Sequence, residues 1–229
     1  MFIDKTPEKN EIYFVWLNKY AGIAVRTPSK TLIIDPVDIK ARDFKNVDAV
    51  LITHEHYDHL DQPLVKEIQK QTQCMVIADR TSARRLHNAV PSEKLEEVQP
   101  ASEVNIDSVV IRAESCNHPA ATPVSFLISS EDGVKVYHTA DSLPFPEMSK
   151  IGEKDKPDLT FCTIGIAPGA SPATGLDIAR LTKPKVAVPY HTGSKTEQRR
   201  FAEIMQQELP KIACLIPETG KIYQVSRKV

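Results

Sequence analysis

A short segment of the sequence, from Thr53 to His59, carries three of the chain's seven histidines and one aspartate directly after the apolar stretch 48–52. Along a strand and the loop that continues it, residues two apart point the same way, so His54, His56 and Asp58 could converge while His59 points toward a neighbouring place. Imidazole and carboxylate are ligands that zinc, manganese and iron share, and a catalytic metal site leaves a position open for water. The spacing favours two metal ions over one and indicates hydrolytic chemistry. The alternative is a histidine cluster on a solvated loop that binds nothing.

The pattern His-x-His-x-Asp-His after an apolar strand resembles the metallo-β-lactamase superfamily. This resemblance implies three further ligands at later strand ends, and the matching residues are His118, Asp141 and His191. Each also follows a β-branched run, where a strand leaves its sheet and side chains can gather. A single loop histidine is more often structural than a ligand. The joint order and context of the three residues favour a metal site.

The resemblance also implies how the ligands are grouped. His54, His56 and His118 would hold one metal, and Asp58, His59 and His191 the second, with Asp141 between the two. The expected cofactors are two divalent ions, with zinc as the first choice and manganese or iron as alternatives. Such ions lower the pKa of bound water toward about 7 and so provide a hydroxide nucleophile. Asp58, a ligand beside that water, is the candidate catalytic residue that receives and relays the proton.

Four residues outside the ligand set are candidates for supporting roles. Asp35, at the end of the strand-like stretch 31–35, is expected either to accept the free ring N–H of a ligand histidine or only to begin the turn before Pro36. Lys19, Tyr20 and Lys195 lie close in sequence to loops of the site and are candidates for substrate contact, with ordinary solvated side chains as the alternative. Two dications, two carboxylates and one hydroxide leave about one positive charge. The expected substrate is therefore a small anionic molecule with an ester, lactone or phosphoester bond.

Within the superfamily, the chain looks most like the branch that contains L-ascorbate-6-phosphate lactonase. Members of that branch often carry Gly-His soon after the first strand, whereas this chain has Asn18-Lys19-Tyr20 there. Three other functions fit the sequence less well. A nuclease or phosphodiesterase acting on nucleic acid is disfavoured by the charge, and a di-iron oxidoreductase by His56, where that group carries glutamate. A non-catalytic binding protein would be expected to lack ligands, and none of the seven is missing.

The order of strand and helix signals agrees with the α/β fold that the resemblance implies. We expect a four-layered αββα sandwich of the metallo-β-lactamase type, with two mixed sheets flanked by helices and a single domain over residues 1–229. Strands are predicted near 11–17, 21–27, 31–35, 48–52, 74–78, 109–114, 123–130, 133–138, 159–164, 185–189, 212–216 and 221–226. Helices are predicted near 62–71, 80–88, 174–182 and 195–208. Asp61 is the expected N-cap of the first helix, and Leu64, Val65 and Ile68 are expected to share one of its faces.

Composition agrees with a globular, cytoplasmic protein. Hydrophobic residues make up 41% and charged residues 26% of the 229 residues, and 29 Lys plus Arg against 30 Asp plus Glu give a net charge of −1. No global field attracts a polyanion, so nucleic acid is not an expected partner. No secretory signal pattern and no apolar segment long enough to span a membrane are seen. The four cysteines are expected to be reduced, and Cys116 is not expected to bind metal; homo-oligomerisation is left open.

Overall fold

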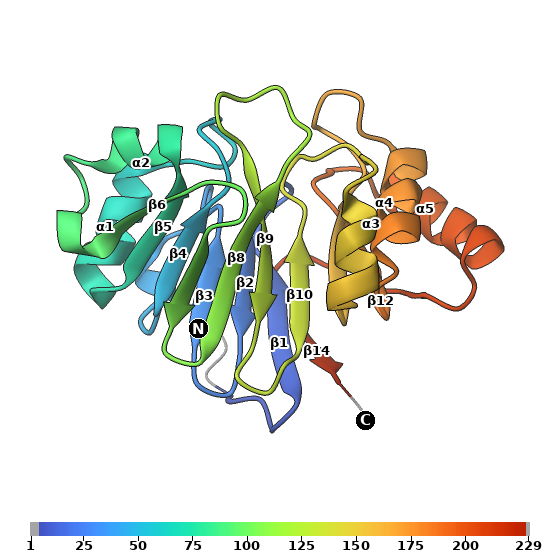
Figure 1. The fold of residues 1–229 in the computed structure, drawn as a ribbon, viewed down its shortest axis with the longest axis horizontal. Helices are drawn as coiled ribbons and strands as arrows, with labels where there is room; N and C mark the ends of the chain where they lie inside the picture. Colours follow the sequence, from blue (N-terminus) through green and yellow to red (C-terminus); the bar gives the residue numbers. More distant parts are fainter. Residues whose placement is uncertain (1–4, 228–229) are drawn as a thin grey trace.

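Two β-sheets face each other, and each carries helices on its outer side (Figure 1). The computed structural model describes residues 5–227. Both sheets have seven strands: the order is β14-β1-β2-β3-β4-β5-β6 in the first and β13-β12-β11-β10-β9-β8-β7 in the second. Parallel and antiparallel pairs occur in both sheets. This is the predicted αββα sandwich with two mixed sheets.

The strands and helices alternate along the chain largely as their apolar patterns predict. The strands of the first sheet are β1 (Glu11–Trp16), β2 (Ile23–Arg26), β3 (Thr31–Ile34), β4 (Ala49–Ile52), β5 (Met75–Asp79), β6 (Leu95–Val98) and β14 (Ile222–Ser226). Those of the second are β7 (Glu103–Ile106), β8 (Val109–Ser115), β9 (Val124–Ser129), β10 (Lys135–His138), β11 (Leu159–Thr163), β12 (Val186–Tyr190) and β13 (Ala213–Cys214). The α-helices are α1 (Gln62–Thr72), α2 (Arg80–Leu86), α3 (Met148–Lys150), which continues as a π-helical turn over Ile151–Asp155, α4 (Pro172–Thr182) and α5 (Lys195–Glu208). Short 3-10 turns cover Ala41–Asp43 and Ser92–Lys94.

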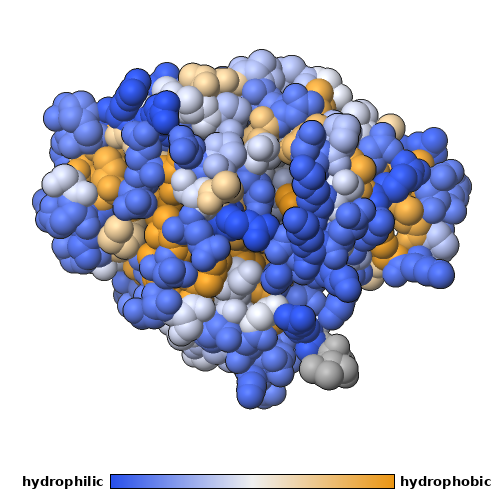
Figure 2. All heavy atoms as spheres, in the orientation of Figure 1, coloured by the Kyte–Doolittle hydropathy of each residue, from blue (hydrophilic) through white to orange (hydrophobic). Residues whose placement is uncertain are grey.

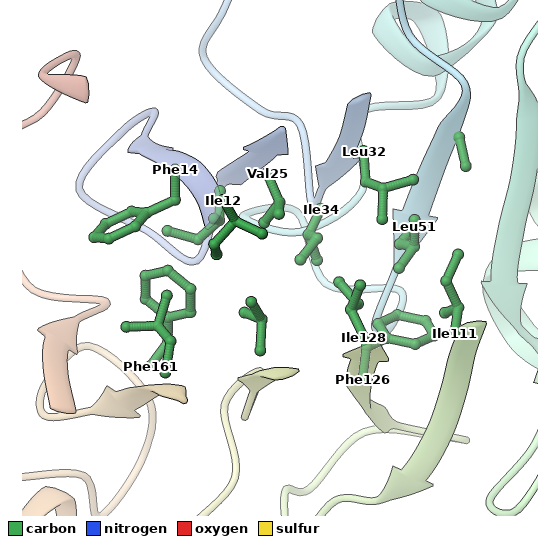
Figure 3. Packing of buried hydrophobic residues seen from close by; sticks show 14 of the residues in the cluster. Ile12, Phe14, Val25, Leu32, Ile34, Leu51, Ile111, Phe126, Ile128 and Phe161 are labelled. Atoms are coloured by element: carbon green, nitrogen blue, oxygen red, sulfur yellow. The ribbon is translucent and has the colours of Figure 1, made fainter. Parts of the chain in front are cut away.

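The main core lies between the two sheets. Figure 3 shows Phe14, Val25 and Leu51 of the first sheet facing Phe126 and Phe161 of the second. The rings of Phe14 and Phe161 meet edge to face with centroids 5.2 Å apart. Such a pair adds about 0.5–1.5 kcal/mol to the stabilisation that comes from burial alone.

Most inner strands are apolar on both faces because both faces are covered. In β4, Ala49 and Leu51 point into the core between the sheets, while Val50 and Ile52 point toward the helices on the other side. The helix α1 supplies the covering residues there, since Leu64, Val65 and Ile68 belong to the same cluster as Val50. Asp61 begins α1 as the predicted N-cap: its carboxylate accepts a 3.0 Å hydrogen bond from the amide of Leu64.

The second sheet is covered by α4 and α5, whose apolar residues pack against β11 and β12 in a third cluster. On the face of the molecule in Figure 2, hydrophilic residues cover most of the surface and hydrophobic residues appear between them in recesses. Within the described residues, no helix is both long and apolar enough to cross a membrane.

Several elements, among them the helix α3, differ from the sequence-based expectation. The segments Leu95–Val98 and Glu103–Ile106 form β6 and β7, although no strand is predicted there. Both lie at the outer edge of a sheet and carry exposed polar side chains, so their apolar signal is weak. The predicted strand 212–216 contains only the short strand Ala213–Cys214, and α4 begins two residues earlier than predicted, at Pro172, with Ser171 as its cap.

Candidate metal centre

Seven histidine and aspartate side chains from four separate loops meet at one edge of the sandwich. The loop after β4 supplies four of them, and the segments after β8, β10 and β12 supply His118, Asp141 and His191. Their ligating atoms form two groups, and within each group all of these atoms lie within 4.8 Å of one another. The groups are His54, His56 and His118, and Asp58, His59, Asp141 and His191. The structure therefore brings together all seven residues singled out as candidate ligands.

Asp141 lies between the two groups, with one carboxylate oxygen turned to each. Its Oδ2 atom is 3.8 Å from Nε2 of His118 and 4.0 Å from Nε2 of His54. Its Oδ1 atom is 3.1 Å from Nε2 of His59 and 2.9 Å from Nδ1 of His191. Asp141 thus presents one carboxylate oxygen to each of the two groups.

Several polar atoms of the cluster are buried and form no hydrogen bond, although Oδ1 of Asp141 lies close to His59 and His191. These atoms are Nε2 of His54, Nε2 of His59, Oδ1 of Asp141 and both ring nitrogens of His191. Buried polar atoms are nearly always hydrogen-bonded, because an unsatisfied one costs about 1–3 kcal/mol. In the first group, Nδ1 of His56 and Nε2 of His118 are 3.1 Å apart, close to the roughly 3.4 Å that separates two ligand atoms on one tetrahedral zinc ion. The residues present thus fit divalent metal ions.

Thr53 and Asp35 form a buried support beneath the cluster. Asp35 accepts hydrogen bonds from the amide of Thr53 at 2.8 Å and from its hydroxyl at 2.7 Å, and it lies 2.7 Å from Nδ1 of His59. The Thr53 hydroxyl is also 3.0 Å from Nδ1 of His54 and 3.2 Å from Nδ1 of His59. With Nδ1 of each ring occupied in this way, Nε2 of each is left facing the centre. Asp35 therefore has the contact expected of a residue that orients a ligand histidine.

The electrostatics of the cluster favour a cation. Burial and the adjacent His59 hold the pKa of His54 well below its ordinary value. Burial also disfavours a charge on His59, but the carboxylates of Asp141 and Asp35 outweigh this effect and raise the pKa of His59 to about 10. The carboxylates of Asp141 and Asp35 therefore favour positive charge in the part of the cluster around His59.

Unusual backbone conformations occur at the loops that position the cluster. Asp35, Ala140 and His191 all have positive φ, at 47°, 52° and 54°. Non-glycine residues adopt this left-handed conformation rarely, and such strain gathers at functional sites where the surrounding structure enforces it. One such restraint is Tyr190, whose hydroxyl donates a 2.7 Å hydrogen bond to the carbonyl of Ala140. It connects the backbone before Asp141 with β12, the strand that precedes His191.

The candidate substrate contacts lie beside this cluster rather than within it. The ring of Tyr20 is 6.3 Å from that of His191 and 6.4 Å from that of Tyr57. Lys19 and Lys195 line a pocket that also contains Thr192, the residue after His191.

Two residues of the site carry no separate sequence signal. Thr53 and Tyr57 lie within the histidine-rich segment, but neither is of a type that commonly binds metal. Tyr57 is 80% exposed, which is unusual for a large aromatic side chain and fits a position at the mouth of the site.

The other histidines and the cysteines lie outside both groups. His87 is exposed, with Nδ1 2.6 Å from the carbonyl of Arg84, and His138 is fully buried in the core beneath the loops. Cys116 belongs to neither group of ligating atoms, and the four cysteines are free.

An αββα sandwich with a histidine and aspartate cluster on its strand-end loops defines the class of metallo-β-lactamase-fold proteins. The family model described as "Beta-lactamase superfamily domain" matches residues 19–192, so the chain belongs to the β-lactamase superfamily.

Relatives and solved structures agree with this assignment. A UPF0173 metal-dependent hydrolase of a Polaromonas species is 27% identical over 218 residues, covering 82% of this chain and 80% of the relative. Another, from Caldivirga maquilingensis, is 25% identical over 232 residues and covers 94% of this chain and 99% of its own length. The metallo hydrolase Igni18 from Ignicoccus hospitalis has a similar fold, with a TM-score of 0.80 and 20% identity over 95% of this chain and all of that one (100%).

Proposed function

We propose that the chain is a metal-dependent hydrolase with two divalent metal ions, acting on an ester, lactone or phosphoester bond of a small anionic substrate. The observation that carries this proposal is the set of buried, unpartnered ligating atoms, arranged in two groups with Asp141 between them. The names of the relatives, which are metal-dependent hydrolases, support it. Zinc is the proposed metal because imidazole and carboxylate donors suit it, and the resemblance to the lactonase branch makes a lactone one of the bonds to test.

When bound, the ions would supply an activated water and a Lewis acid for the scissile group. The chain's own residues hold and orient the reacting groups. His54, His56 and His118 would hold one ion, and Asp58, His59 and His191 the other, while Asp141 would contact both. Thr53 and Asp35 would fix the rings of His54 and His59 through their Nδ1 atoms.

Asp58 is the proposed proton acceptor. Its Oδ2 atom is 3.4 Å from Nε2 of His191 and 3.9 Å from Nε2 of His59, so the carboxylate lies inside the second group. Burial alone would raise the pKa of Asp58, but the adjacent rings of His191 and His59 outweigh this effect and lower the pKa. An ionised carboxylate at this place can take the proton of the attacking water and deliver it to the leaving group.

Metal analysis combined with a hydrolysis screen tests the proposal. We expect close to two metal ions per chain by elemental analysis, and turnover of one class among ester, lactone, phosphomonoester and phosphodiester reporters. Asp141→Ala and His59→Ala should each lower the metal content and abolish hydrolysis, because each removes a ligand from a buried group. Cys116→Ser is the matched control and should keep both metals. Full metal retention in both ligand variants would contradict the proposed centre.

A further inference from the structure

A pocket of about 530 Å³ is lined in part by the loop that follows β12 and the candidate ligand His191. Three segments that are distant in sequence form its walls: the loop between β1 and β2, the loop from β12 into the first turns of α5, and the segment before β14. Thr192 and Gly193, which follow the candidate ligand His191 directly, are part of its wall. A substrate bound at the metal centre could therefore extend into this pocket.

Three cationic side chains line the pocket, and none has an ion pair with another described residue. They are Lys19 from the β1–β2 loop and Lys195 and Arg199 from α5. One carboxylate, that of Glu218, also lines the pocket, but it forms a 3.2 Å ion pair with Lys221. The nearby carboxylate of Glu197 is hydrogen-bonded to the Thr192 hydroxyl. The pocket thus has an excess of unpaired positive charge in a chain whose net charge is −1.

The loop that carries Lys19 is held in place from the inside. The indole N–H of Trp16 donates a 2.7 Å hydrogen bond to the carbonyl of Tyr20, and the side-chain amide of Asn18 donates one of 2.7 Å to the carbonyl of Val37. Nε2 of His138 lies 2.9 Å from the carbonyl of Ala21. A fixed loop loses little conformational entropy on binding, so its lysine is suited to recognition.

The formal charge of the proposed metal centre bears on how an anionic substrate would be attracted. The expectation from sequence counted two carboxylates, Asp58 and Asp141, against two dications. Asp35 is a third buried carboxylate in the same cluster, 2.7 Å from His59. Counting Asp35 lowers the formal charge of the loaded centre from about one positive unit to about zero. Cationic side chains beside the centre would then supply most of the attraction for an anionic substrate.

We propose that the pocket binds an anionic group of the substrate, a phosphate or a carboxylate remote from the scissile bond, through Lys19, Lys195 and Arg199. This inference rests on the proposed hydrolase function and names the residues that bind the anionic group of its substrate. The helix α5 begins at the pocket, and the positive end of its dipole acts in the same direction as the three cations.

Trp16 provides a direct test because it is the chain's one tryptophan and lines the pocket. Inorganic phosphate and acetate, titrated separately into the metal-loaded protein, should change the Trp16 fluorescence in a saturable way. The stronger of the two anions identifies the group. Lys195→Ala and Arg199→Ala should raise the half-saturating concentration about tenfold or more, the usual effect of losing one charged hydrogen bond. Arg200→Ala is the matched control, because Arg200 lies on the same helix but pairs with Glu203 outside the pocket.

The possible outcomes distinguish anion binding in the pocket from anion binding to the metal ions. A signal that persists when a chelator is present supports the pocket, whereas a signal lost on chelation means that the anion binds to the metals and overturns the proposal. Equal effects of Arg199→Ala and Arg200→Ala, or no fluorescence change with either anion, would also overturn it. Because the fluorescence does not depend on turnover, a protein that binds anions but hydrolyses no reporter would leave the pocket supported and the proposed function contradicted.

Discussion

At the scale of single residues, the hydroxyl of Thr53 lies close to three side chains of the proposed metal centre. It contacts Oδ2 of Asp35 and approaches Nδ1 of both His54 and His59. These contacts restrain two rings whose Nε2 atoms face the proposed metal ions. Groups that orient metal ligands in this way typically change metal affinity about 10–100-fold when they are removed.

We therefore expect Thr53→Val to lower zinc affinity about 10–100-fold, because valine keeps the shape of threonine but loses the hydroxyl. Competition against a chromophoric chelator measures this affinity. The control is Thr160→Val in β11: the Thr160 hydroxyl is also buried but has no hydrogen-bond partner, so its loss should leave zinc affinity unchanged. If both variants bound zinc as tightly as the natural chain, Thr53 would have no role in positioning the ligands.

The sequence allowed the seven candidate ligands to be located because each stands at the end of an apolar strand, in an order that resembles a known family. The support beneath them was harder to predict. Asp35 could equally be a turn residue before Pro36, and its partner, 24 positions away, is set by the parallel pairing of β3 and β4. Arg199 gave no signal because an arginine on an amphipathic helix is usually only solvated.

At the scale of secondary-structure elements, the loop between β1 and β2 depends on a buried histidine from the opposite sheet. His138 in β10 accepts a 3.3 Å hydrogen bond at Nδ1 from the amide of Ala140 and has Nε2 2.9 Å from the carbonyl of Ala21. The ring is therefore neutral, with its proton on Nε2. Burial lowers the pKa of His138 to about 4.

This pKa predicts a loss of stability in weak acid. The unfolded chain binds a proton at His138 near pH 6.5, whereas the folded chain binds it only near pH 4. The free energy of unfolding is therefore unaffected by this residue above pH 6.5 and falls as the pH decreases toward 4, because the unfolded chain takes up the proton first. From pH 7 to pH 5 the free energy of unfolding should fall by about 2 kcal/mol through this residue. Urea unfolding at both pH values, with chelator present throughout, should show a fall smaller by about that amount in His138→Gln. His87→Gln, at an exposed histidine, is the control, and an equal fall in all three proteins would contradict the assignment to His138.

The sequence predicted strands correctly where burial on both faces produces long apolar runs, as in β4 and β11. It did not predict β6 and β7, because an edge strand needs only one apolar face and its sequence then resembles that of a loop. The pairing of β14 with β1 also could not be predicted, because nothing in the local pattern of Ile222–Ser226 identifies its partner strand.

At the scale of the whole molecule, the proposed metal centre joins the two sheets. Four candidate ligands follow β4 of the first sheet, and the other three follow β8, β10 and β12 of the second. Asp141 comes from the second sheet, yet its Oδ1 atom is 3.1 Å from His59 of the first. Bound metal would therefore connect the two layers at one edge of a core that is otherwise held by apolar contacts.

Removing metal should destabilise the whole protein, because ligands that bind only the folded chain shift the unfolding equilibrium. At a free metal concentration about 100 times the dissociation constant, this contribution is about 2.7 kcal/mol, which corresponds to roughly 5–10 °C in Tm for a chain of this size. Thermal unfolding with and without chelator should show this difference in the natural chain and in Cys116→Ser. The difference should disappear in Asp141→Ala, which lacks the carboxylate between the two groups. Identical Tm values with and without chelator in the natural chain would mean that metal does not join the sheets. The two sheets separate on unfolding, so a metal ion that links them must raise the Tm.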